Sequence, residues 1–431
     1  MSYFDINSFI EKIKSSINNC VNSCVNSNES VSELLKGREY YKPFRYPEFY
    51  ERWKKHERGH WLPSEVPMHE DVNDWKNKLD QNQRDFLTNI FRFFTQGDVD
   101  VAGAYCTEYL PNFSQTPEIG MFMCSVAGRE AVHIDAYSYL IETLGMPEST
   151  YKEFLQYHEM KEKQNYIKQF QKGSYGSLGD KKSFIFIMII LLALSNIWFG
   201  ILKSIFFVFP FLCIVLTRLY RNKQTKIKEH IAAGIALFSG FTEGMQLFSS
   251  FTMLLSFPMN GLMRGMGQIV TWSIVDETQH TDGMISLFRI FVDENSKCSC
   301  SCKFKNILGC SCIRRDVLEQ TVYNIAREMV NLEDAFIELA YEKYSSDEVF
   351  MNISKTTLKQ YIRFIADKRL TTMRYKSIFG IKNNPLPEFE IMINAPIHTN
   401  FFENRSTDYA KTDNGDWGLI WGNEIKDHKK V

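Results

Sequence analysis

The chain of 431 residues has almost no net charge, because 51 acidic residues offset 50 lysines and arginines. Charge therefore gives no reason to expect binding to nucleic acid or to an acidic membrane surface. The sequence also lacks a Gly-rich phosphate loop, a dinucleotide fingerprint and a serine or cysteine nucleophile arrangement. Residues 1–36 lack the apolar run of a secretory signal and the Arg-rich bias of a transit peptide. We expect a cytoplasmic protein in which residues 1–36 form a mobile extension.

The ten cysteines are too unevenly placed to form a disulfide framework for a whole domain. This distribution favours a reducing, intracellular compartment. Five of them fall within residues 296–315, at Cys298, Cys300, Cys302, Cys310 and Cys312. Their spacing is Cys-x-Cys rather than the usual Cys-x-x-Cys of zinc sites, and no histidine is near. We interpret residues 296–315 as an inserted loop, with zinc or copper(I) binding as the alternative.

A nearly uninterrupted apolar stretch lies between residues 184 and 216. Its first part, 184–202, is about long enough to cross a hydrocarbon core of roughly 30 Å. The second part, 205–216, is short and contains Pro210. We interpret residues 173–227 as a hydrophobic insert that forms a re-entrant hairpin, an interfacial anchor or a hydrophobic flap. If residues 184–216 are exposed, they offer a surface for membrane contact.

Two short segments carry most of the chemical signal. Residues 128–140 read GREAVHIDAYSYL, and residues 274–283 read IVDETQHTDG. Each contains Glu-x-x-His, as Glu130 with His133 and as Glu277 with His280. Residues three apart share one face of a helix, so each pair can present a carboxylate and an imidazole to one point. One copy is a weak signal, but two copies on apolar helical segments predict half of a metal cage.

Two further acids stand on apolar helical stretches. Asp98 follows the apolar stripe that ends at Phe94, and Glu243 is a lone acid in the apolar segment after residue 229. A buried carboxylate needs a partner, so both are candidate metal ligands. Asp100 competes with Asp98, and both would be solvated if the helix breaks after Gly97. The alternative for Glu243 is a protonated or hydrogen-bonded core residue.

The candidate ligands together comprise four carboxylates and two imidazoles. This set suits iron or manganese rather than a thiol-seeking metal, and four carboxylates balance the charge of two divalent ions. A metal pair of this kind activates dioxygen. Tyr137 lies four residues after His133 on the same helical face, which makes its phenol an oxidisable neighbour. The alternative is a core tyrosine whose hydroxyl is satisfied by a hydrogen bond.

The segments described above resemble a known family, the small, radical-generating subunit of class I ribonucleotide reductase. The resemblance covers about residues 37–172, 228–295 and 316–412. It rests on blocks that stand in the order and register of that family: WLPSEVP, FFTQGD, REAVHIDAY, FTEGMQLFSSF, MGQIVTWSIVDETQH, AREMVNLEDAFIELA, YIRFIADKRL and HTNFFENRSTDYAK. It implies an all-α fold, with a ferritin-like helical bundle over residues 37–395, a di-metal site in the bundle core and a flexible C-terminal tail over residues 396–431.

The resemblance also implies a cofactor of two iron ions per chain, with manganese as an alternative. The matching ligand positions are Asp98, Glu130, His133, Glu243, Glu277 and His280. Tyr137 matches the tyrosine that becomes the stable radical. Leu247 and Phe251 would help to form the dry pocket around it.

Other matching positions imply a route by which the radical leaves the subunit. Trp61, Asp276 and His133 match the proton-coupled electron route from the metal site to the surface. Tyr409 matches the tyrosine in the flexible tail that relays the radical toward the large subunit. The implied partners are a second copy of this chain, in a homodimer, and the large subunit, which reduces ribonucleotides to deoxyribonucleotides.

Two other functions are alternatives to this interpretation. The first is another ferritin-like di-metal oxidase or desaturase, attached to a membrane through residues 184–216. The second is a non-catalytic paired subunit that stabilises an active partner, although the full ligand set argues against it. Residues 173–227 and 296–315 have no counterpart in the resemblance, so they are either lineage-specific insertions or translated non-coding sequence.

Overall fold

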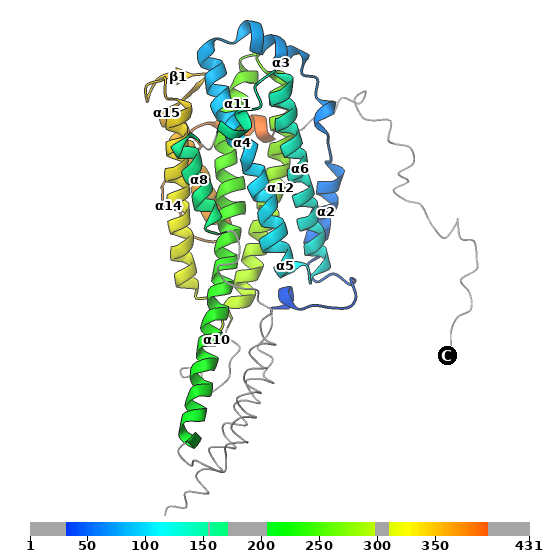
Figure 1. The fold of residues 1–431 in the computed structure, drawn as a ribbon, viewed down its shortest axis with the longest axis vertical. Coiled ribbons are helices and arrows are strands. Elements are labelled where there is room, and N and C mark those ends of the chain that lie inside the picture. Colours follow the sequence, from blue (N-terminus) through cyan, green and yellow to red (C-terminus); the bar gives the residue numbers. More distant parts are fainter. Residues whose placement is uncertain (1–31, 154–155, 171–204, 298–309, 395–431) are drawn as a thin grey trace, which may run out of the picture.

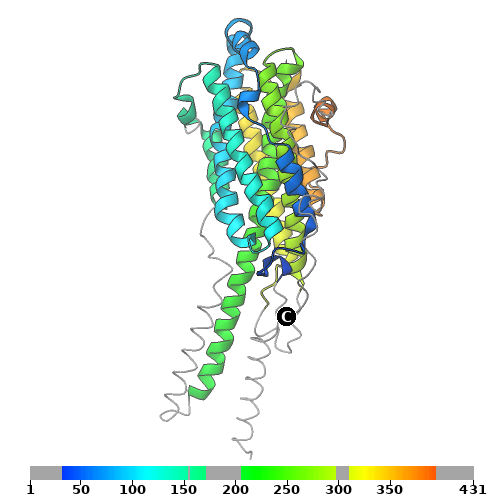
Figure 2. The same ribbon diagram turned by 90° about the vertical axis from the view of Figure 1, so that its right-hand side faces the viewer.

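The computed structural model describes residues 32–153, 156–170, 205–297 and 310–394. The predicted all-α fold is confirmed, because the described chain folds into helices and a single small hairpin of β1 (Val349–Phe350) with β2 (Ile353–Ser354). The long helices run side by side along one axis (Figures 1 and 2). Tyr409 and the predicted tail from residue 396 onward lie outside the described residues, as do residues 1–31 of the predicted extension.

Four long helical segments form the centre of the bundle. They are α4 (Gln81–Ala104), α6 (Pro117–Thr143), α12 (Arg264–Ser296) and a continuous helix made of α10 (Ile205–Ile235), the π-helix η6 (Ala236–Gln246) and α11 (Leu247–Met259). α6 packs against both α4 and α12, while α12 also packs against η6 and α11. Contacts between α11 and α4 close the arrangement. Four helices therefore face a common interior.

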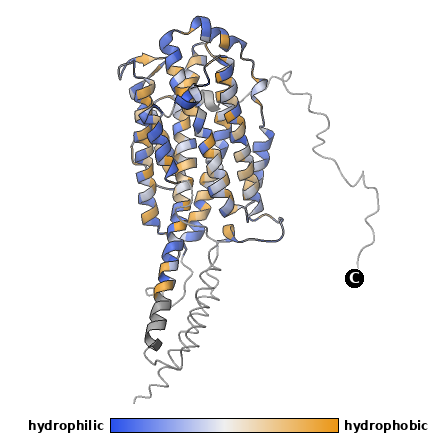
Figure 3. Ribbon diagram, viewed as in Figure 1, coloured by the Kyte–Doolittle hydropathy of each residue, from blue (hydrophilic) through white to orange (hydrophobic). Residues whose placement is uncertain are grey.

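Other elements cover this centre. α2 (Pro47–Arg58) packs on α6 and α12. α14 (Arg315–Ala340) and α15 (Lys355–Thr372) cover the side formed by η6, and α8 (His158–Lys168) packs on α14. Hydrophobic and hydrophilic residues alternate around the helices, as amphipathic helices in a layered bundle require (Figure 3). The shorter elements are η1 (Glu33–Leu35), η2 (Pro63–Glu65), α3 (His69–Asn73), η3 (Asp74–Lys78), η4 (Tyr105–Tyr109), α5 (Leu110–Phe113), α7 (Thr150–Glu153) and α16 (Pro387–Asn394).

Polar side chains fix the starts of the helices that carry the candidate ligands. Asp80 begins α4 with a capping box, in which its carboxylate accepts the backbone N–H of Gln83. The first N–H groups of α12 are satisfied from a distant element, because Asp71 accepts the N–H groups of Gly265 and Met266 at 2.8 Å. Carboxylates at helix N-termini satisfy free N–H groups and complement the helix dipole. These caps fix where α4 and α12 begin.

The described part of the two predicted inserts is joined to the bundle. Residues 205–235 form α10, whose N-terminal part extends beyond the end of the bundle (Figures 1 and 2). Thr225 of α10 donates hydrogen bonds to the carbonyls of Cys310 and Cys312, and Arg314 pairs with Glu229. The end of the hydrophobic segment and the end of the cysteine-rich segment therefore contact each other.

One helix among the described residues is long and apolar enough to cross a membrane by length and composition alone. It runs over Val215–Met259, and 94% of its most apolar stretch of 18 residues is buried inside the structure. This degree of burial is typical of a core helix in a soluble protein. Residues 184–204, the first part of the predicted membrane-contact segment, lie outside the described residues.

Gly283 of α12 lies in close contact with Phe122 of α6. A Cβ atom at this position would lie 2.3 Å from Cζ of Phe122, which is fully buried. We expect Gly283→Ala to lower the free energy of unfolding by about 1–3 kcal/mol, because overpacking forces the helices apart. Thermal unfolding followed by circular dichroism measures this effect.

Gly128→Ala is the matched control for Gly283→Ala. A Cβ atom at Gly128 meets no atom within 4 Å, so the added methyl group should be neutral or stabilising through helix propensity. Equal melting temperatures for the two variants would contradict the predicted close contact between α12 and α6.

Candidate metal centre

All six candidate ligands converge in the interior of the bundle, and each is at most 1% exposed. Asp98 comes from α4, Glu130 and His133 come from α6, Glu243 comes from η6, and Glu277 and His280 come from α12. Their ligand atoms form two overlapping groups. Asp98, Glu130 and His133 make one group, and Glu130, Glu243, Glu277 and His280 make the other, with all atoms of a group within 4.8 Å of one another.

Glu130 and Glu277 lie between the two histidines. Oε1 of Glu130 is 3.0 Å from Nδ1 of His280, and its Oε2 is 3.5 Å from Nδ1 of His133. Glu277 repeats this geometry, with Oε1 at 3.1 Å from His133 Nδ1 and Oε2 at 3.3 Å from His280 Nδ1. Each of these carboxylates can therefore span two adjacent metal positions, while Asp98 and Glu243 each serve one.

Several atoms of this cluster are buried without a hydrogen bond of acceptable geometry. They include Oδ2 of Asp98, both oxygens of Glu130, Oε1 of Glu243, Oε2 of Glu277 and Nδ1 of His280. Such atoms are costly in a protein interior unless another partner satisfies them. Their lone pairs converge on a shared space, and their oxygen and nitrogen chemistry matches that preferred by iron and manganese. The residues therefore fit a pair of such ions.

The pKa values of the cluster show that its bare charges conflict. Burial, followed by repulsion from Glu130, raises the pKa of Asp98 well above its usual range, and burial with repulsion from Glu277 does the same for Glu243. Burial opposes charge on Glu130 too, but its close contacts with the rings of His133 and His280 outweigh it and lower its pKa to about 2. Two divalent ions would balance the four carboxylates and remove this conflict.

Asp98, rather than Asp100, joins the cluster. Asp98 is 1% exposed and shares a ligand group with Glu130, whereas Asp100 is half-buried and accepts hydrogen bonds from Gln96 and Gln164. Two residues along a helix differ by about 200° in direction, so only one of the pair can face the interior.

Glu243 stands on the π-helix η6, every residue of which is buried. A second π-helix, η4, carries Tyr105, whose hydroxyl donates to Oε2 of Glu243 at 3.3 Å. This bond leaves Oε1 of Glu243 to face His280 Nδ1, 3.8 Å away. π-helical turns are often found at functional sites because they shift a side chain out of the regular α-helical register. In this protein they bring a carboxylate and its supporting phenol together.

Tyr137 lies in an aromatic environment next to the cluster. Its ring stacks on Phe94 with centroids 4.3 Å apart, and Phe94 stacks in turn on Phe251 at 5.6 Å. The Tyr137 hydroxyl is buried without a hydrogen-bond partner of acceptable geometry. Burial, followed by the negative charge of Asp98, raises the pKa of Tyr137 far above its usual value. The phenol therefore stays protonated. Leu247 is also buried, on α11.

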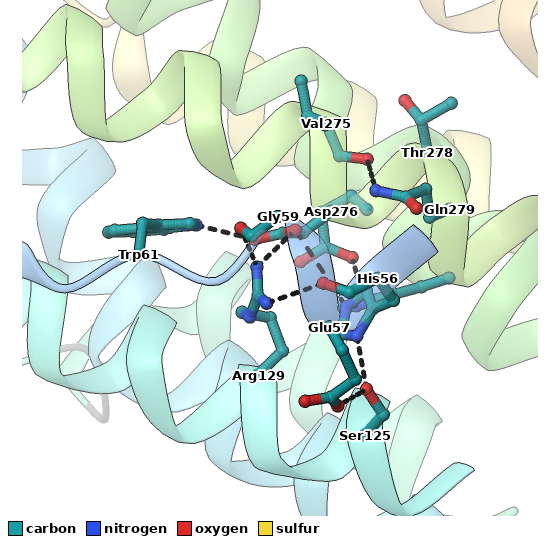
Figure 4. A network of polar contacts seen from close by, with 12 residues as sticks. His56, Glu57, Gly59, Trp61, Ser125, Arg129, Val275, Asp276, Thr278 and Gln279 are labelled. Carbon is teal, nitrogen blue, oxygen red and sulfur yellow. Dashed lines mark hydrogen bonds and ion pairs between the residues drawn. The ribbon is translucent and has the colours of Figure 1, made fainter. Parts of the chain in front are cut away.

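A chain of two hydrogen bonds through Asp276 connects the cluster with Trp61. Oδ2 of Asp276 accepts the indole N–H of Trp61 at 2.8 Å (Figure 4). The same oxygen lies 3.2 Å from Nε2 of His133. Oδ1 of the same carboxylate accepts from Arg129 at 2.7 Å. Burial opposes the charge of Asp276, but the hydrogen bond to His133 and the charges of His133 and Arg129 lower its pKa below its usual range. Asp276 is therefore an ionised link between an indole and a candidate ligand.

Three residues of this site carry no signal in the sequence that we recognised. Arg129 is one position before Glu130 and faces Asp276, while Phe94 belongs to an apolar stripe that looks like ordinary core. His56 lies on α2, and this helix buries it against His280.

The helical bundle and its buried carboxylate–histidine cluster define this chain as a ferritin-like protein of the di-metal type. Residues 38–217 and 214–385 match the family model described as ribonucleotide reductase, small chain. The chain belongs to that family, whose members are oxidoreductases and work with a large subunit.

Relatives with similar sequences carry the same description. The chain is 57% identical over 405 residues to a probable ribonucleoside-diphosphate reductase small subunit of Invertebrate iridescent virus 6, covering 90% of this chain and 98% of the relative. A second such protein, of Invertebrate iridescent virus 3, is 42% identical over 388 residues and covers 89% and 88% of the two chains. The small subunit of Dictyostelium discoideum is 26% identical over 370 residues, covering 86% of each.

Solved structures support the same fold. A ribonucleotide reductase R2 subunit from Clostridium botulinum aligns with a TM-score of 0.57 at 14% identity, over 83% of this chain and 91% of that chain. A dimanganese(II) protein from Streptococcus sanguinis aligns with a TM-score of 0.54 at 15% identity, over 81% and 96%. The family assignment favours a reductase subunit over the alternative of a membrane-attached oxidase or desaturase.

Proposed function

We propose that this chain is the radical-generating subunit of a class I ribonucleotide reductase. The observation that carries the proposal is the convergence of six buried ligand residues beside a buried, protonated tyrosine. Two iron ions bound there, or two manganese ions, would supply the redox chemistry that activates dioxygen and oxidises Tyr137. The radical then passes to a large subunit that reduces ribonucleotides to deoxyribonucleotides.

Within this proposal, the six candidate ligands divide the work of binding. Glu130 and Glu277 would each contribute to both metal positions, because each points one oxygen toward His133 and the other toward His280. Asp98 completes the position next to His133, and Glu243 completes the position next to His280.

The surroundings of Tyr137 suit a stable radical. Phe94 and Phe251 replace water with apolar rings on one side of the phenol, and the hydroxyl is buried. A phenoxyl radical in such a place is shielded from solvent and from other reductants. Tyr137 can therefore store the oxidising equivalent until the large subunit requires it.

Trp61, Asp276 and His133 form the proposed exit for the radical. Asp276 can accept the indole proton as an electron leaves Trp61, because Oδ2 already accepts that N–H. The same oxygen contacts the outer nitrogen of His133, whose inner nitrogen faces the metal site. Trp61 is flanked by the exposed residues His60 and Leu62, so this chain of hydrogen bonds ends near the surface. We assign Tyr409, outside the described residues, to the next step.

We further propose that the subunit acts as a cytoplasmic homodimer, as the family resemblance implies. The large subunit and a second copy of the chain are its expected partners. Neither nucleic acid nor a membrane is required for this function. A completely formed ligand cluster also argues against a purely stabilising, non-catalytic subunit.

Trp61→Phe tests the proposed exit route. We expect normal metal content and a normal tyrosyl radical, but a loss of about 100-fold or more in ribonucleotide reduction with the large subunit, because phenylalanine cannot release the indole proton and electron. Trp272→Phe is the matched control, since the Trp272 ring lies 5.2 Å from that of Trp61. Equal activity of the two variants would argue against this route.

A further inference from the structure

The outer face of His280 contacts a second buried histidine. Nδ1 of His280 points into the ligand cluster, while its Nε2 lies 2.9 Å from Nε2 of His56. His56 comes from α2 and is 1% exposed. Its Nε2 lies 4.0 Å from Oδ1 of Asp276, and Figure 4 shows the two side chains next to each other. No step of the proposed function uses His56.

The contact between the two rings fixes their protons. A histidine that binds a metal through Nδ1 carries its proton on Nε2. Nε2 of His280 must therefore donate, and Nε2 of His56 must accept. His56 is 1% exposed, and a neutral imidazole has one N–H and one lone pair, so the lone pair on Nε2 of His56 can accept this proton. Its own proton then lies on Nδ1.

Two more residues hold His56 in that tautomer. Nδ1 of His56 lies 2.6 Å from Oγ of Ser125, and the Ser125 hydroxyl donates to Oε1 of Glu57 at 2.5 Å. Glu57 is exposed and Ser125 is half-buried. A carboxylate only accepts, so it orients the serine hydroxyl outward and leaves Oγ to accept from His56. The hydrogen bonds from His280 through His56 and Ser125 to Glu57 therefore all donate in one direction, away from the ligand cluster.

The two candidate histidine ligands thus have different outer partners. Nε2 of His133 meets the carboxylate of Asp276, which is paired with Arg129, whereas Nε2 of His280 meets the imidazole ring of His56. A carboxylate partner draws more strongly on the imidazole proton and makes the ring a stronger metal donor. The position next to His133 and the position next to His280 are therefore chemically unequal.

We propose that His56 is a positioning residue of the metal centre, which accepts the Nε2 proton of His280 and so aims Nδ1 at the metal position completed by Glu243. Ser125 and Glu57 support it by keeping His56 in the accepting tautomer. This proposal rests on the proposed function, because it requires that the cluster binds metal. It gives one of the two histidine ligands, His280, a hydrogen-bond partner on the side that faces away from the metal. Only one of the two metal positions is therefore affected by His56.

The test is anaerobic calorimetric titration of the metal-free protein with manganese(II). Wild type should bind two ions. His56→Leu should weaken one of the two sites by about 10- to 100-fold and leave the other within about threefold. His56→Gln should restore most of the loss, because its amide oxygen can accept the same proton. His230→Leu, which removes a half-buried imidazole of α10 that stacks on Phe170, should leave both sites unchanged.

Three results would overturn the proposal. They are unchanged affinities in His56→Leu, an equal loss at both sites, and no rescue by His56→Gln. If His56→Leu does not fold, Ser125→Ala serves as the test instead. This variant should weaken the same single site by about threefold. Unchanged affinities in Ser125→Ala would reject the role of His56. Failure of the proposed function is distinguishable, because wild type would then bind no manganese at all.

Discussion

Replacing Tyr137 with phenylalanine is expected to abolish the tyrosyl radical while the metal content stays at the wild-type level. Phenylalanine keeps the stacking on Phe94 but has no hydroxyl to oxidise. The lost hydroxyl makes no hydrogen bond of acceptable geometry, so the variant should be as stable as wild type or slightly more stable. Electron paramagnetic resonance and metal analysis on the same samples provide the measurement.

Tyr139→Phe is the matched control for this experiment. Tyr139 lies on the same helix, and its hydroxyl donates to the carbonyl of Val66 rather than facing the cluster. This variant should keep both the metals and the radical signal. A full radical signal in Tyr137→Phe would exclude Tyr137 as the radical site.

Replacing Glu130 with alanine is expected to prevent assembly of both metal positions. Glu130 is the residue that belongs to both ligand groups, and its two oxygens face His133 and His280. Without Glu130, each of the two ions would lack one carboxylate ligand and part of its charge balance. We expect metal content to fall from about two ions per chain to well below one, with ribonucleotide reduction lost entirely.

Asp100→Asn provides the control for the loss of an acid near the site. Asp100 lies on α4 close to Asp98 but outside the cluster, and it contacts Gln96 and Gln164. Its substitution should leave metal content unchanged. Retention of two ions by Glu130→Ala would show that the cluster is not the binding site.

Four of the six candidate ligands were accessible from the sequence because their spacing is local. Glu130 with His133, and Glu277 with His280, share a helix face whatever the rest of the fold does. The choice between Asp98 and Asp100 was harder, since both stand on one helix. Only the packing of α4 against α6 decides which of them faces the interior.

Contacts between distant elements were not accessible in this way. His56 and His280 are 224 positions apart in the sequence. Arg129 of α6 and Asp276 of α12, which form a hydrogen bond, are 147 positions apart. A histidine on α2 has no spacing rule that links it to a ligand on α12. The outer partners of the ligands follow from helix packing, which the apolar pattern predicts only in outline.

The most direct test of the account is reconstitution of the metal-free protein with ferrous iron and dioxygen, followed by metal analysis and electron paramagnetic resonance. The account predicts about two iron ions per chain and a tyrosyl radical signal from the wild-type protein. A protein that is folded but retains no iron, or that binds two ions and forms no radical with either iron or manganese, would contradict it.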